Sequence, residues 1–213
     1  MVESTLTLHT LRGVEPSLFL WYRIMFIVEQ QLFISPIPNY LFKKLETYAF
    51  DALEKKEHTG DSEEVALKEE YNMDGYPEEF EKWVAETIDL YFHKHTAKEG
   101  FYGIDDRHLK IQSIWTNRMT KGDVHKPHCH KGCLYAFVAY IRTGPDDAGF
   151  CYMFTEETGK IAITSVPVDE RTQGHILIFP ADMPHTVYPK TNDGERISVS
   201  GNICCYVDGG YVD

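Results

Sequence analysis

Residues 122–135 read GDVHKPHCHKGCLY, and this stretch governs how the rest of the sequence is interpreted. His125, His128 and His130 are three of the ten histidines in the chain, and they lie within six consecutive positions. Side chains two apart on a β-strand point to the same face, so His128 and His130 are expected to point together. The odd spacing of His125 places it on the opposite face. Two imidazoles on one face form a chelate for iron, zinc, copper or nickel.

A third candidate ligand, His185, lies in the segment FPADMPHTVYP at residues 179–189. It begins an apolar run after a turn that contains proline. A facial metal site needs three ligands on one side and open positions on the other. A ligand from a distant strand meets that need, so His185 is expected to join His128 and His130. The remaining histidines are interpreted as structural or surface residues: His9, His58, His93, His95, His108 and His175.

The sequence around these histidines is typical of a β-barrel or sandwich. From residue 109 onward, short apolar runs alternate with turn signals such as GPDD, EETG and NDGE. Short strands at such spacing predict a closed or two-sheet all-β architecture. The expected strands are 110–117, 134–141, 150–154, 160–166, 175–179, 185–187 and 196–206.

The part of the chain before residue 109 predicts a strand and two helices. The run at 18–34 is rich in large apolar residues and suggests a buried strand. Apolar residues at helical spacing predict a helix at about 40–56, which Asn39 would cap. The polar stretch 57–75 is interpreted as a connection, and a second helix is expected at about 78–98.

The sequence gives no sign of a linker or repeat, so one domain over residues 1–213 is expected. Within it, residues 1–108 would supply the N-terminal strand and supporting helices. Residues 109–213 would form the barrel that carries the metal site. The fold class is therefore mainly β with flanking helices.

Composition excludes several classes of partner. The formal net charge is −12, which argues against a general nucleic-acid binder and against docking on anionic membranes. The apolar run at 18–34 is too short and too polar to span a bilayer. No basic leader precedes it, so a cytoplasmic protein is expected, in the host cytoplasm if a phage encodes it. The cysteines are interpreted as free thiols in a reducing compartment: Cys129, Cys133, Cys151, Cys204 and Cys205.

The histidine segments resemble the two cupin motifs. The first, G-x5-H-x-H, is matched by Gly122, His128 and His130, although Leu134 and Tyr135 stand where its glutamate follows. The second, G-x5-P-x-G-x2-H, is approximated here, with aspartate in place of its second glycine. Its residues are Gly174, Pro180, Asp182 and His185. This resemblance implies a double-stranded β-helix, or jelly roll, with the histidines on the metal.

The segment 111–203 more closely resembles the iron- and 2-oxoglutarate-dependent oxygenases. The likeness is to a branch common in phages and marine bacteria, related to prolyl and aspartyl hydroxylases. That branch combines a W-x-N strand, an HxH pair, a turn of the form FP…H…P, and R-[IL]-S with a later asparagine. The corresponding residues are Trp115, Asn117, His128, His130, Phe179, Pro180, His185, Pro189, Arg196, Ile197, Ser198 and Asn202. The resemblance implies Fe(II), 2-oxoglutarate and O2 as reactants.

Arg196 and Ser198 have the chemistry to hold the distal carboxylate of 2-oxoglutarate. A guanidinium offers a planar fork to a carboxylate, and a neighbouring hydroxyl adds another donor. The two residues are two apart, so both can face the barrel interior. The alternative for Arg196 is a surface ion pair with Glu195. Further candidates for the cosubstrate pocket are Asn117, Tyr135 and Asn202, with Trp115 in the cavity wall.

His130 departs from the HxD or HxE pattern that most of these oxygenases use. Three alternatives follow for position 130: direct ligation by His130, a water molecule in its place, or loss of activity. Direct ligation is the preferred interpretation.

Three functions follow from these interpretations. The first is an oxygenase that hydroxylates an unidentified substrate, for example a protein side chain, and releases succinate and CO2. The second is a three-histidine cupin dioxygenase that needs no cosubstrate and acts, for example, on a thiol. The third is a non-enzymatic jelly-roll module of the kind found in virions. The Arg196-x-Ser198 pair favours the oxygenase, because the other two have no use for a carboxylate-binding arginine.

Overall fold

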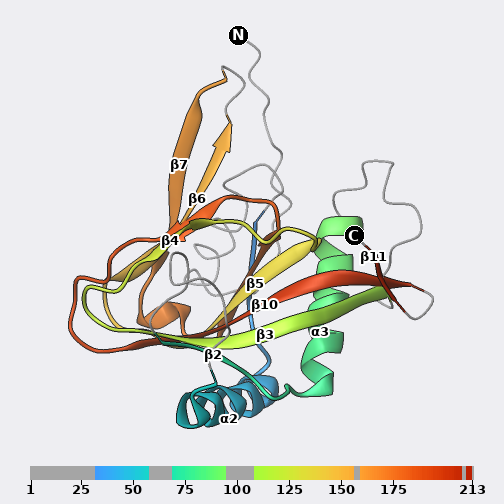
Figure 1. The fold of residues 1–213 in the computed structure, drawn as a ribbon, viewed down its shortest axis with the longest axis horizontal. Helices are drawn as coiled ribbons and strands as arrows, with labels where there is room; N and C mark the ends of the chain where they lie inside the picture. The colour runs from blue at the N-terminus through green and yellow to red at the C-terminus, as the bar shows by residue number, and fades with distance from the viewer. Residues whose placement is uncertain (1–31, 58–68, 95–107, 156–158, 208–209, 213) are drawn as a thin grey trace, which may run out of the picture.

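The computed structural model describes residues 32–57, 69–94, 108–155, 159–207 and 210–212. Two antiparallel sheets face one another, and the two α-helices lie on the opposite face of the larger sheet (Figure 1). The expected fold class, mainly β with flanking helices in a jelly-roll arrangement, is confirmed. Among the described residues, no helix is long and apolar enough to cross a membrane.

The larger sheet joins strands from both halves of the chain. Its order is β1-β8-β5-β10-β3-β2, and β11 pairs with the far end of β10. The two N-terminal members, β1 and β2, thus occupy the two edges of the sheet. The bounds are β1 (Phe33–Pro36), β2 (Glu69–Asn72), β3 (Leu109–Met119), β5 (Tyr135–Arg142), β8 (His175–Pro180), β10 (Arg196–Val207) and β11 (Gly210–Val212).

The smaller sheet carries two of the three candidate ligands. Its order is β4-β9-β6-β7, and its strands are β4 (His125–His128), β6 (Asp147–Thr155), β7 (Ile161–Val168) and β9 (His185–Val187). A short 3-10 helix, η3 (Glu170–Thr172), connects β7 to β8. All seven expected strands are present. The expectation that 57–75 only connects is wrong in part, because β2 forms there and pairs with the middle of β3. Residues 18–31 of the expected first strand lie outside the described residues.

Both predicted helices are present. The first, α2 (Asn39–Lys55), buries Leu41, Leu45 and Ala49, which recur every fourth residue on one face. Its N-cap is Pro38 and no side chain caps it, so the predicted role of Asn39 is wrong. The second, α3 (Glu78–Ile88), continues as a π-helix, η1 (Asp89–Lys94). Residues 95–98 of that prediction lie outside the described residues.

Alternation along β10 divides the core between two layers. Ile197 and Val199 belong to the cluster that packs the helices against the larger sheet. Arg196 and Ser198 face the other way, into a pocket between the two sheets. A second apolar cluster, which includes Phe150 and Phe179, fills the rest of the space between the sheets. The pocket therefore has one rigid wall, supplied by a sheet whose outer face is covered by helices.

Candidate metal centre

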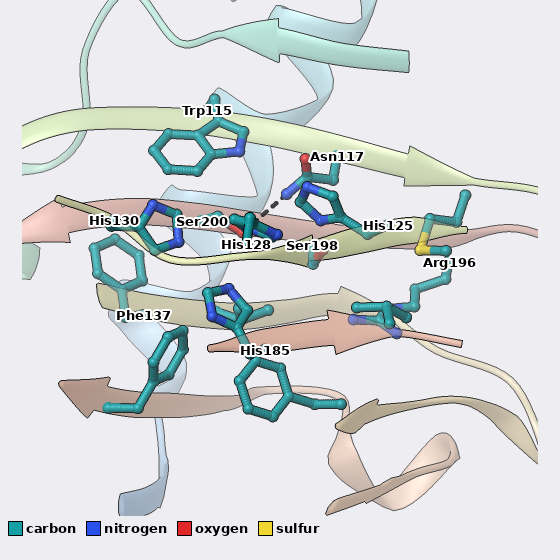
Figure 2. A pocket seen from close by; sticks show the side chains of 15 residues that line it. Trp115, Asn117, His125, His128, His130, Phe137, His185, Arg196, Ser198 and Ser200 are labelled. Carbon is teal, nitrogen blue, oxygen red and sulfur yellow. Dashed lines mark hydrogen bonds between the residues drawn. The ribbon is translucent and has the colours of Figure 1, made fainter. Parts of the chain in front are cut away.

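Three histidines converge at one end of the pocket. His128 is the last residue of β4 and pairs directly with His185, the first residue of β9. His130 follows two residues after β4 ends. The ligand nitrogens of the three rings all lie within 4.8 Å of one another, and among the described residues no other cluster of this kind occurs. Figure 2 shows the three rings turned toward a common space.

His130 reaches this space from a loop. The predicted continuous strand through His130 is wrong, because β4 stops at His128. The backbone N–H of His130 instead donates to the carbonyl of Ala181 across 2.7 Å. The ring lies nearly parallel to that of His185, with 5.1 Å between centroids and 23° between planes. A hydrogen bond to the turn before β9, rather than strand alternation, therefore positions His130.

His125 also lines the pocket, which the sequence did not predict. The pairing of β4 with β9 shifts register between His125 and His128. That irregularity cancels the odd spacing, and the two rings lie 4.2 Å apart. Pro127 was the available signal, because proline cannot donate to a strand ladder and commonly accompanies a bulge.

Burial keeps His185 and His130 neutral. Burial first, and then the neighbouring His128, lower the pKa of His185 to about 3 and that of His130 to about 4. The same two causes, burial first, lower the pKa of His125. A neutral imidazole has a lone pair on one ring nitrogen, which is what a metal requires.

Backbone carbonyls orient two of the rings. Nδ1 of His128 lies 2.8 Å from the carbonyl oxygen of Lys126, and Nδ1 of His185 lies 2.9 Å from that of Met183. A carbonyl oxygen only accepts, so each Nδ1 carries the proton and donates. The lone pair then resides on Nε2 of each ring. Fixing the tautomer and ring orientation in this way is typical of metal-binding histidines.

Arg196 lies at the other end of the pocket and is 2% exposed. Nη1 donates to the carbonyl of Ala148 at 2.6 Å, and the guanidinium lies over the ring of Tyr140. Nε is buried without a hydrogen-bond partner. The alternative ion pair with Glu195 does not form, because that carboxylate binds Arg118 and Arg142. Arg196 appears in none of the ion pairs found among the described residues, so it is a buried cation beside a cavity.

The wall between the two ends is polar. Ser198 and Asn117 line it, and Asn117 donates from Nδ2 to Oγ of Ser200 at 2.8 Å (Figure 2). Oδ1 of Asn117 and Nε1 of Trp115 are buried without hydrogen-bond partners. Buried polar atoms are nearly always paired, so these atoms indicate room for a polar ligand. Ser200 was missed, although its spacing of two after Ser198 could have placed it on the same face.

Two predicted cosubstrate residues do not reach the pocket. The ring of Tyr135 packs on Phe92 with 5.0 Å between centroids, and burial raises its pKa to about 12. Asn202 donates from Nδ2 to Oγ of Ser113 at 3.0 Å, beyond the pocket lining. By contrast, the structure brings the other six predicted residues and Trp115 together around one cavity: Asn117, His128, His130, His185, Arg196 and Ser198.

Residues 113–202 match a family model described as "Putative 2OG-Fe(II) oxygenase". This match covers 90 of the 213 residues and, together with the fold, supports a 2OG-Fe(II) oxygenase. The matched segment contains all three converging histidines, Arg196 and Ser198. This oxygenase therefore depends on Fe(II) and 2-oxoglutarate, and its histidine cluster is of the kind that can hold the iron. A comparison with curated proteins gave no match.

Solved structures agree on the fold of this oxygenase. A prolyl-4-hydroxylase from Pseudomonas putida is 16% identical, with 84% of this chain and 94% of that one covered and a TM-score of 0.55. The carbocyclase SnoK from nogalamycin biosynthesis is 14% identical, with 93% and 87% covered and a TM-score of 0.58. A prolyl hydroxylase from Trichoplax adhaerens, in complex with a hypoxia-inducible-factor peptide fragment, is 14% identical, with 90% and 94% covered and a TM-score of 0.53.

Proposed function

We propose that this oxygenase is a hydroxylase in which His128, His130 and His185 hold Fe(II) and Arg196 holds 2-oxoglutarate. The observation that carries the proposal is a single pocket with a cluster of three imidazoles at one end and, at the other, a buried guanidinium that forms no ion pair with any described residue. When bound, the iron supplies oxygen activation coupled to oxidation of 2-oxoglutarate to succinate and CO2. The residues of the chain bind, orient and shield the reactants.

The three histidines fit iron by their donor chemistry. Imidazole nitrogen is a good ligand for iron, and three rings on one side leave the other side open. The carbonyl contacts of His128 and His185 hold their Nε2 lone pairs in one orientation before a metal arrives. Such preorganisation lowers the cost of binding.

Arg196 fits the distal carboxylate of the cosubstrate. A guanidinium that is buried without an anion is costly, so its position beside the cavity calls for an acidic ligand. Nη1 is held by Ala148, which sets the plane of the fork. The unpartnered Nε remains as a donor, and the hydroxyl of Ser198 faces the same cavity. Together they suit a carboxylate better than a single ammonium would.

A calorimetric titration of the anaerobic Fe(II) protein with 2-oxoglutarate tests this function. Arg196→Ala should weaken 2-oxoglutarate binding by roughly ten- to a hundredfold, because a charge-assisted hydrogen bond contributes about 1.5–3 kcal/mol. Arg196→Lys keeps the charge but loses the fork, so its affinity should fall between those of the wild type and Arg196→Ala. Iron binding should change little in either variant. Absence of binding by the wild type at millimolar 2-oxoglutarate would refute the oxygenase mechanism.

For the substrate, we propose a protein side chain. The support is the fold shared with the Trichoplax adhaerens prolyl hydroxylase, which holds a peptide fragment. The test is incubation with peptides under turnover conditions, followed by mass spectrometry for the gain of one oxygen atom. Oxidation of free metabolites alone would redirect the assignment to a small-molecule substrate.

A three-histidine dioxygenase that needs no cosubstrate is the second candidate, and the histidine cluster itself favours it. A dioxygenase of this kind needs no carboxylate-binding arginine, so it does not explain why Arg196 is buried beside the pocket. Oxygen consumption by the Fe(II) protein that is independent of added 2-oxoglutarate would support this candidate over the hydroxylase.

A further inference from the structure

Two cysteines meet next to the loop that carries His130. Sγ of Cys133 lies 2.8 Å from Sγ of Cys204, although the residues are 71 positions apart in sequence. Both thiols also contact the side-chain carbonyl oxygen of Gln112, at 3.2 and 3.3 Å. All five cysteines of the chain are free thiols in this structure. The contact therefore describes a reduced pair of thiols, and no sequence motif predicts that these two cysteines meet.

The backbone around the pair already holds the two sulfurs near bonding position. The N–H of Leu134 donates to the carbonyl of Ile203 at 2.9 Å, so the residues that flank the two cysteines are directly linked. Sγ of Cys204 also contacts the carbonyl of Gly132 at 3.6 Å. A disulfide bond is about 2.05 Å long, so the sulfurs need to approach by less than an ångström.

The other cysteines lack such a partner. Cys205 follows Cys204 on β10, and successive strand residues point to opposite faces. Cys151 is fully buried on β6, and its sulfur contacts the carbonyl of Gly149. Within the described part of the chain, no contact of the Cys129 sulfur is found, although this residue lies in the same loop as Cys133. Cys133 is partly exposed and Cys204 is buried. The Cys133 thiol is therefore accessible to a reagent in solvent, and the Cys204 thiol is accessible only to Cys133.

We propose that Cys133 and Cys204 are a site of reversible disulfide formation with a low-molecular-weight disulfide such as oxidised glutathione. The Cys133 thiolate attacks one glutathione sulfur, which breaks the S–S bond and releases one glutathione thiolate. The Cys204 thiolate then attacks the Cys133 sulfur of this mixed disulfide and displaces the second glutathione thiolate. Two protein thiols lose two protons and two electrons, and one oxidised glutathione becomes two glutathiones. A dithiol reverses the reaction by the same exchange.

The bond would join the loop 129–134 to β10. That loop carries His130, and β10 carries Arg196 and Ser198, so the cross-link ties together two walls of the pocket. Closing a long chain segment restricts the unfolded state. The oxidised protein should therefore melt at a higher temperature than the reduced protein, by up to about 10 °C.

The test uses the full chain, reduced and then exposed to oxidised glutathione, with free thiols alkylated before digestion without reductant. Mass spectrometry should find one peptide pair joined through Cys133 and Cys204, and dithiothreitol should remove it. Cys133→Ser and Cys204→Ser should each abolish both the cross-link and the rise in melting temperature. Cys205→Ser, the matched control, should keep both.

Two results would overturn the proposal. One is a mixed disulfide with glutathione at Cys133 that never resolves onto Cys204. The other is a cross-link that uses Cys129 or Cys205 in place of the assigned partner. Persistence of the cross-link in Cys204→Ser would identify Cys205 as the partner, and persistence in Cys133→Ser would identify Cys129.

Discussion

At the residue scale, the distinctive feature of the site is an imidazole at position 130. In the related pattern HxD or HxE, a carboxylate at this position gives the iron one negative charge. His130 gives none, because burial and the nearby His128 keep it neutral near pH 7. The bound metal would thus keep more of its positive charge, which changes its affinity and its reactivity.

Replacing His130 tests whether it is a ligand. His130→Asp restores the negative charge, so the affinity for Fe(II) should stay the same or rise. His130→Ala should lower that affinity without abolishing it, because two ligands remain. Anaerobic competition with a chromogenic chelator gives both dissociation constants. Equal affinities in the wild type and His130→Ala would favour a water molecule at that position.

We expect His128 and His185 to be indispensable for iron binding. His128→Ala and His185→Ala should each lose most of the bound iron, because these are the two rings whose orientation backbone carbonyls fix. His125→Ala is the matched control: it removes an imidazole from the same pocket but not from the converging cluster. Metal analysis after dialysis measures the stoichiometry, and circular dichroism checks folding. Full iron occupancy in His185→Ala would remove that residue from the site.

At the element scale, β10 connects the two layers of the molecule. Its outward residues pack under the helices, and its inward residues line the pocket. Gly201 of β10 lies directly opposite Phe137 of the neighbouring strand β5. A Cβ at this position would come within 2.5 Å of two atoms of that ring and 2.9 Å of the Ser113 carbonyl oxygen. Only glycine fits at position 201 without displacing a strand or the buried ring of Phe137.

Gly201→Ala should therefore destabilise the protein by about 1–3 kcal/mol, as expected for overpacking a tight core. Urea denaturation followed by tryptophan fluorescence gives the change in the free energy of unfolding. Gly144→Ala is the control, because a Cβ there meets nothing within 4 Å. It should change stability by less than about 0.5 kcal/mol. Equal stability of the two variants would show that Phe137 moves aside freely.

At the scale of the whole molecule, the first half of the chain supports the metal-bearing half. The edge strands β1 and β2 and both α-helices come from residues 33–88. Leu41, Phe80 and Ile88 from the helices share one apolar cluster with Ile197 and Val199 of β10. We propose that residues 1–213 act as one domain, because the helices cover a sheet face that would otherwise be apolar and exposed.

This arrangement predicts one cooperative unfolding transition. Far-ultraviolet circular dichroism and tryptophan fluorescence should give coincident melting curves for the full chain. A fragment of residues 109–213 should aggregate or stay unfolded, since it exposes the apolar face of β3, β5 and β10. A soluble fragment with its own sharp transition would show that the two halves are separate folding units.

Strands and ligands were predictable where the information is local. Alternation within a single run is a property of neighbouring residues, so it located the seven expected strands and placed Arg196 and Ser198 on one face. His128 and His185 were recognisable because motif spacing and flanking prolines accompany them. The chemistry of the residue types then indicated a metal at the histidines and a carboxylate ligand at Arg196 and Ser198.

Other features depend on which distant segments pair, and local periodicity carries no such information. A shift in the register of β4 against β9 turned His125 into the pocket. A hydrogen bond from the His130 N–H to the Ala181 carbonyl placed His130 there after its strand had ended. Pairing of β10 with β3 on one side and with β5 on the other took Tyr135 and Asn202 out of reach of the pocket and brought Cys133 onto Cys204. The sequence by itself determined the residue types and the faces on which regular strands present them. The tertiary structure alone decided which distant side chains come into contact, because a one-residue change of register moves a side chain from one face of the sheet to the other.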